Sequence, residues 1–117
     1  MRWNLAALIP LALAGCASMP PPVENLAVAR SLVDQAQAAG ATQFAPVELQ
    51  RARDKLARAD EASRRDRYAD AKALAEEAEV DAELSLTRTR AAKAQQAAAQ
   101  VEQSNRVLGE ELQQRAP

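Results

Sequence analysis

The sequence predicts an all-α protein: a small antiparallel three-helix bundle with a long C-terminal helix that overhangs it. The composition is the first reason, because the chain is 48% hydrophobic while aromatic residues make up only 3%. Most of its hydrophobic residues are alanine, and Ala, Leu, Glu, Gln and Arg together are typical of long helices and coiled coils. The second reason is that residues which interrupt helices are scarce, since the 117 residues contain only three Gly and six Pro. The third is the three- and four-residue spacing of the apolar positions described below.

The first 15 residues have the organisation of an export signal. Arg2 supplies a positive charge, and the apolar run 5–14 is shorter than the ~20 residues that a membrane-spanning helix needs. The next residues, Leu13 to Cys16 ("LAGC"), resemble a bacterial lipobox. We therefore expect residues 1–15 to be a cleaved lipoprotein signal peptide. An ordinary signal peptide with an incidental cysteine is the alternative.

The lipobox resemblance implies that Cys16 is the lipidation site. Its thiol would receive a diacylglyceryl group and its new amine an acyl chain, which together give stable membrane attachment. Ala17 follows, where the resemblance associates Asp with retention in an inner membrane. The expected location is thus the cell envelope, lipid-anchored in the inner leaflet of the outer membrane and facing the periplasm. No other cofactor is expected.

The mature chain divides into a tether and a helical domain. Residues 16–25 contain three consecutive prolines, which form a stiff spacer. The helical domain, 24–117, is expected to contain helices at about 24–39, 46–63 and 67–112. Gly40 suits the position after the first helix, Pro46 the first turn of the second, and Asp66 the N-cap of the third. We expect the segment 40–45 to be a plain connection.

The third helix should extend far beyond the other two. At 1.5 Å per residue it measures ~69 Å, against roughly 27 Å for the second. A heptad pattern runs along it from Val80, and its C-terminal end supplies a candidate seam for self-association or for a partner: Val101, Asn105, Leu108 and Leu112. The alternatives are a solvated single helix, a homotypic coiled coil, and a docking strip for an envelope protein.

Two aromatic residues remain in the mature chain, Phe44 and Tyr68. They fall at opposite ends of the second helix, so we expect each to act as a structural plug that closes one end of a small-residue core. Phe44 should meet Leu84 or Leu86. A ligand-binding role for the two rings is the alternative.

Charged residues form an acidic block at 76–83 and a basic block comprising Arg88, Arg90 and Lys93. Such runs usually form solvated faces, and we expect that here. An antiparallel partner that matches the two blocks is the alternative.

The segment 38–85 resembles a bacterial family known as domain of unknown function 4398. The resemblance rests on a Gly-Ala pair, an aromatic-Ala-Pro-x-Glu-Leu motif, and a second aromatic that begins an Ala-rich helix with Asp-Ala. These residues are Gly40, Ala41, Phe44, Ala45, Pro46, Glu48, Leu49, Lys55, Leu56, Tyr68, Ala71, Leu74, Ala75, Asp81 and Ala82. Phe44 stands where the family more often has Tyr. Members look like envelope lipoproteins, and the resemblance supplies no activity.

Several function classes are not expected. The chain has no His and one Cys, which removes the commonest general base and the usual metal ligands. Fifteen basic and 16 acidic residues give no electrostatic case for nucleic acid. We therefore expect no enzyme, no metal and no small-molecule substrate. Two functions remain: a structural envelope lipoprotein, or an accessory lipoprotein that presents its long helix to an envelope complex or to a separate wall-binding partner.

Overall fold

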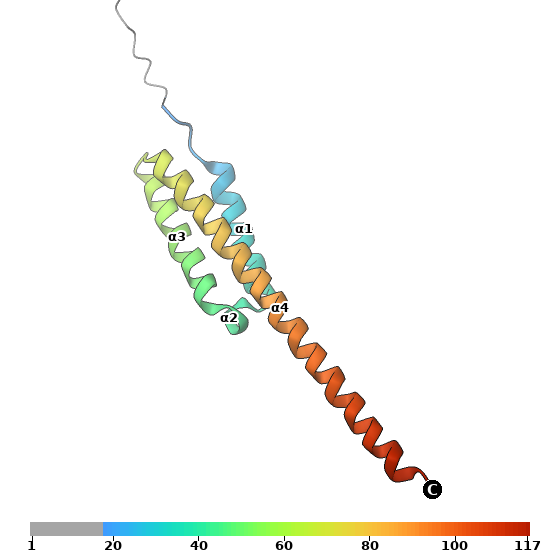
Figure 1. Cartoon of the computed structure of the whole chain (residues 1–117). Coiled ribbons are helices and arrows are strands. Elements are labelled where there is room, and N and C mark those ends of the chain that lie inside the picture. The colour runs from blue at the N-terminus through green and yellow to red at the C-terminus, as the bar shows by residue number, and fades with distance from the viewer. Residues whose placement is uncertain (1–17) are drawn as a thin grey trace, which may run out of the picture.

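The computed structural model describes residues 18–117, and this part of the chain is all-α, as predicted. It is elongated, and its extended shape fits a long final helix (Figure 1). The helices are α1 (Val23–Ala39), α2 (Ala41–Phe44), α3 (Pro46–Arg64) and α4 (Tyr68–Arg115). In the described range, no helix is both long enough and apolar enough to cross a membrane.

The connection between α1 and α3 contains a helical turn, α2, where we expected none. Gly40 ends α1 in the left-handed conformation (φ 99°), and its N–H donates to the carbonyl of Gln37 at 3.0 Å. The carbonyl of Gly40 then accepts from the N–H groups of Gln43 and Phe44. Ala45 is non-helical (φ −147°, ψ 54°), and Pro46 begins α3 where its missing N–H has no cost. The turn forms because the glycine carbonyl is free to accept after α1 has ended.

Asp66 is not the N-cap of the final helix. It adopts φ 58° after α3, and its N–H donates to Ser63 O at 3.1 Å. The next N–H, of Arg67, donates to Ala62 O at 2.9 Å, which completes the hydrogen-bond pattern of a helix ending in a left-handed residue. Aspartate is suited to both places, because it tolerates this conformation better than most residues. Arg67 takes the N-cap position of α4 without a side-chain cap.

The first half of α4 packs against both α1 and α3 (Figure 1). Two core clusters lie between them. The cluster near α2 consists of Val33, Ala36, Ala41, Leu49, Ala52, Ala82 and Leu86. The cluster near the α3–α4 turn consists of Leu26, Ala29, Ala59, Ala75 and Ala78. Since alanine buries little area, close helix approach rather than bulk supplies most of the contact.

We call α1, α2, α3 and residues 68–92 of α4 the head, and residues 93–115 the arm. Every residue from Lys93 onward is exposed. The arm extends about 35 Å beyond the head. The arm leaves one end of the head, whereas residues 18–22 lead into α1 at the opposite end (Figure 1).

Candidate functional site

Polar contacts fasten α4 to the head at the point where the arm begins. Glu48 is buried at the start of α3, and its carboxylate pairs with the guanidinium of Arg88. One turn earlier, Ser85 Oγ donates to the carbonyl of Ala45 at 3.2 Å. One turn later, Lys93 Nζ donates to the carbonyl of Ala39 at the end of α1. We call Glu48, Ser85, Arg88 and Lys93 the collar, because together they hold α4 to both α1 and α3.

The collar corrects the expectation that the basic block is wholly a solvated face. Arg88 pairs with Glu48 of α3 and Lys93 donates to the Ala39 carbonyl of α1, although much of the Arg88 side chain stays in contact with water. Sequence reasoning missed these contacts because they depend on which turn of α4 lies beside α2. The sequence feature that could have indicated these contacts is Glu48. This carboxylate lies in the first turn of α3, directly before the core residue Leu49.

Phe44 is half-buried and is not a full plug. It lies outside the core cluster that contains Leu86, and Leu84, its other expected partner, is exposed. Its ring is covered instead by Lys93, whose Nζ lies 5.7 Å from the ring centroid. Because α4 continues past α2, the long cationic side chain of Lys93 can reach over the Phe44 ring.

Tyr68 is also half-buried, at the opposite end of the head. Its hydroxyl donates to Asp66 Oδ1 at 2.7 Å, and this hydrogen bond raises the pKa of the phenol. Together with Ser18 and Met19 it lines a shallow hollow where the tether passes the start of α4. The two aromatics thus mark the two ends of the head, one beside the tether and one beside the arm.

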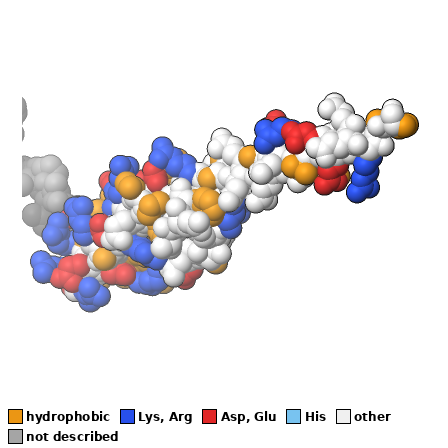
Figure 2. Space-filling model, turned by 90° about the horizontal axis from the view of Figure 1, so that it is seen from below, with side chains coloured by type: hydrophobic (Ala, Val, Ile, Leu, Met, Phe, Trp, Pro, Cys, Tyr) orange, Lys and Arg blue, Asp and Glu red, His pale blue; other side chains and the backbone are white. Residues whose placement is uncertain are grey.

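The seam residues are all exposed on the arm. The exposed fractions are 59% for Val101, 56% for Leu108 and 71% for Leu112, and Asn105 lies between them. Figure 2 shows the arm as a narrow rod of mostly uncharged atoms near the head, with charged side chains closer to its tip. No part of the described chain covers this apolar strip.

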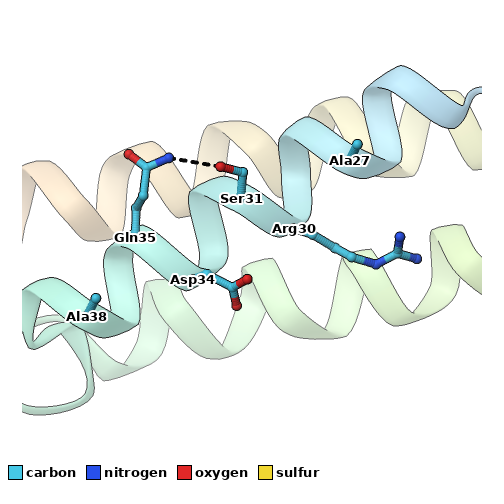
Figure 3. A pocket seen from close by; sticks show the side chains of 6 residues that line it. All are labelled: Ala27, Arg30, Ser31, Asp34, Gln35 and Ala38. Atoms are coloured by element: carbon cyan, nitrogen blue, oxygen red, sulfur yellow. Dashed lines mark hydrogen bonds between the residues drawn. The ribbon is translucent and has the colours of Figure 1, made fainter.

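The outer face of α1 carries another shallow hollow (Figure 3). It is lined by Ala27, Arg30, Ser31, Asp34, Gln35 and Ala38. Gln35 Nε2 donates to Ser31 Oγ at 3.1 Å, while Arg30 turns toward α3 and pairs with Asp60. These are contacts of a hydrated helix surface. Within residues 18–117 no group of three or more potential metal ligands comes together.

Glu79 is a poorly compensated carboxylate in the head. Its Oε1 is buried without a hydrogen-bond partner. Burial, and then the neighbouring charges of Glu76 and Glu83, raises the pKa of its carboxyl group. The folded state therefore holds this proton more tightly than the unfolded state does. It follows that ionised Glu79 opposes folding at neutral pH, and that the opposition disappears as the pH falls and the carboxyl is protonated.

We expect Glu79→Gln to raise the melting temperature at pH 7, with the gain shrinking toward pH 4. The amide removes the buried charge, and at acid pH the native carboxyl is neutral as well. Thermal melts followed by circular dichroism across this range measure the effect. Glu110→Gln, at an exposed arm position, is the control and should have little effect. A gain of equal size at both pH values would contradict the assignment.

The described chain is thus an all-α protein with a packed head and an exposed helical arm. The family model named "Domain of unknown function (DUF4398)" matches residues 24–101. The chain belongs to this family. The match covers the head and the base of the arm, whereas Asn105, Leu108 and Leu112 lie beyond it. A search of curated proteins and a search of solved structures each found no match. Cys16 and the signal segment lie outside the described residues.

Proposed function

We propose that the protein is a non-catalytic lipoprotein of the bacterial cell envelope with a structural, organising role. Cys16 carries the lipid and attaches the chain to the inner leaflet of the outer membrane, so that the head and arm face the periplasm. The observation that carries this proposal is the opposite placement of tether and arm (Figure 1). A chain attached through its tether holds the head near the membrane surface and leaves the arm free to extend away from it.

The fold suits this role. We propose that α1, α3 and the first half of α4 form an antiparallel three-helix bundle that folds as one unit. The collar supports this arrangement, because Glu48–Arg88 and Lys93–Ala39 connect α4 to two different helices. Because α4 is held at the collar, the orientation of the head determines that of the arm. The bundle is therefore a base, and the arm is the part that reaches other molecules.

The second candidate function is that of an adaptor that presents α4 to an envelope complex or to a separate wall-binding protein. The exposed apolar residues of the arm favour it, because a solvated strut has no need of Val101, Leu108 and Leu112 on one strip. The two functions differ in the partner that the strip contacts: another copy for a structural rod, a different protein for an adaptor.

The anchor is tested by Cys16→Ser. Cells that express the full chain are grown with a labelled fatty acid, and the chain is recovered from membrane and soluble fractions. We expect the native chain and an Ala17→Ser control to carry label in the membrane fraction, and Cys16→Ser to carry none. Labelled Cys16→Ser protein in the membrane would overturn the lipid assignment.

The organising role is tested by crosslinking and pull-down from detergent-solubilised envelopes. Recovery of copies of the chain alone favours the structural rod, and one stoichiometric heterologous partner favours the adaptor. A chain that lacks residues 95–117 keeps Lys93 and hence the collar, so its head should remain folded. If this truncated chain still recovers the same molecules, the arm is not the contact surface.

A further inference from the structure

The apolar strip of the arm continues onto the outer face of the head. Val80 is 64% exposed, although Ala78, two positions earlier, is completely buried. Two positions correspond to about 200° around a helix, so Val80 lies on the side of α4 opposite to α1 and α3. The same side carries a series at three- and four-residue spacing, which we call the outer stripe: Val80, Leu84, Thr87, Ala91, Ala94, Ala98, Val101, Asn105, Leu108 and Leu112.

We propose that two copies of the chain pair through this stripe in antiparallel orientation, with Leu84 of each copy against Leu108 of the other. This inference rests on the structural-rod form of the proposed function and specifies its partner and orientation. The two tethers leave opposite ends of the pair, so a pair anchored through both lipids lies along the membrane surface, whereas an unpaired chain can extend its arm away from it. It names a second copy as the partner of the arm. It also predicts that the tip of each arm lies along the outer face of the other copy's head.

The register gives layers of matched chemistry. In each layer, one stripe residue faces a stripe residue of the second copy, and each combination occurs twice by symmetry. The layers are Val80 with Leu112, Leu84 with Leu108, Thr87 with Asn105, Ala91 with Val101, and Ala94 with Ala98. The two polar residues face each other, where hydroxyl and amide can form a hydrogen bond, and the large apolar residues face each other.

The charges favour this orientation over a parallel one. In the antiparallel register Glu102 of the second copy approaches Arg88, and Arg115 of the second copy approaches Glu77. Within its own chain Arg88 also pairs with Glu48, and Glu77 pairs with Lys55 at 3.2 Å, but both side chains remain more than half exposed. The one unfavourable approach is Glu83 with Glu111 of the second copy. A parallel pair would instead set Glu77 against Glu77 and Arg115 against Arg115. The one favourable approach in a parallel pair would be between Glu83 and Arg88.

The centre of the antiparallel pair is free of charge. Residues 94–101 contain no Asp, Glu, Lys or Arg, and Figure 2 shows few charged atoms where the arm leaves the head. At a two-fold axis each residue meets its own copy, so a charge there would be repelled by itself. Alanine in the central layers lets the two helices approach closely. The second copy also has clear access, because α1 and α3 occupy the other side of α4.

Orientation is tested by disulfide trapping. Cys16→Ser removes the single native thiol, and Leu84→Cys or Leu108→Cys is then added to the full chain. The two proteins are mixed, oxidised in detergent and separated on a non-reducing gel. We expect a mixed disulfide between Leu84→Cys and Leu108→Cys, and little disulfide in either protein alone. Self-disulfides of each variant would show parallel pairing, and absence of any disulfide would show no pairing, so either result overturns the proposal.

The charge register supplies a second test. Glu111→Lys replaces the unfavourable approach to Glu83 with a favourable one at two symmetric places, so we expect self-association to tighten roughly fivefold. Glu110→Lys makes the same charge change one residue away, on the side of the arm opposite to the stripe, and should leave the association unchanged. Analytical ultracentrifugation in Cys16→Ser measures both. An equal response of the two variants overturns the register.

A last comparison separates pairing from folding. Leu108→Asp places a charge in a large apolar layer, and Gln103→Asp places the same charge on the other side of the arm. Both positions are exposed, so neither change should alter the head, which circular dichroism verifies. We expect only Leu108→Asp to lower self-association, by tenfold or more. Equal self-association of the two variants contradicts the assigned stripe.

Discussion

Leu49→Ala should cost about 3–4 kcal/mol of the free energy of unfolding. Leu49 is 1% exposed and is the largest of the completely buried side chains in the described chain. Its neighbours in the cluster near α2 include the small residues Ala36, Ala52 and Ala82, which cannot expand to fill the space that it leaves. Because small domains are stable by only about 5–15 kcal/mol, a loss of this size should shift the unfolding midpoint strongly.

Urea denaturation of the variant, followed by circular dichroism, measures this loss. Val47→Ala is the matched control, because Val47 lies two residues earlier in α3 and is exposed. It should change the unfolding free energy by less than about 0.5 kcal/mol. A Leu49→Ala protein as stable as the Val47→Ala protein would mean that the core does not depend on Leu49.

Ala59→Leu should destabilise the head by about 2 kcal/mol, by the opposite mechanism. Ala59 is completely buried in the cluster near the α3–α4 turn, where it packs with Ala29, Ala75 and Ala78. The three helices come together on small side chains, so an isobutyl group has no volume to occupy. The helices must separate or the new side chain must adopt a poor rotamer.

The control for this change is Ala57→Leu, two residues earlier in α3 at an exposed position. Leucine and alanine have similar helix propensities, so this control should remain near native stability. The same denaturation measurement compares the two variants. If Ala59→Leu is as stable as Ala57→Leu, the close approach of the three helices is not what stabilises this end of the head.

Local signals in the sequence predicted most helix ends and core positions. Gly40 and Pro46 mark their boundaries through backbone requirements that belong to single residues. The core stripe Leu26, Ala29, Val33 was readable because helix period alone brings these residues to one face. The prediction that Asp66 is an N-cap was wrong because aspartate suits both a helix start and a left-handed helix end, and the sequence did not distinguish them.

The collar could not be predicted from such signals. Its contacts join residues about forty to fifty positions apart, such as Glu48 with Arg88 and Ala39 with Lys93. They require the exact longitudinal register of α4 against α1 and α3. Phe44 shows the same difficulty, because its burial depends on how far α4 continues past it. The seam on the arm was visible as a heptad pattern, but only the placement of α1 and α3 shows that it lies on the open side of α4.

The collar also divides α4 into two parts whose backbone hydrogen bonds open at different rates. The turns of the arm beyond Lys93 make no contact with α1 or α3 and are exposed, so they can open from Arg115 inward at small free-energy cost. Opening that reaches Thr89 must break the collar and expose buried residues, which costs nearly as much as unfolding the head. One continuous helix therefore contains a slow-exchanging segment and a fast-exchanging one, and the boundary between them is set by the contacts of Arg88 with Glu48 of α3 and of Lys93 with the Ala39 carbonyl of α1.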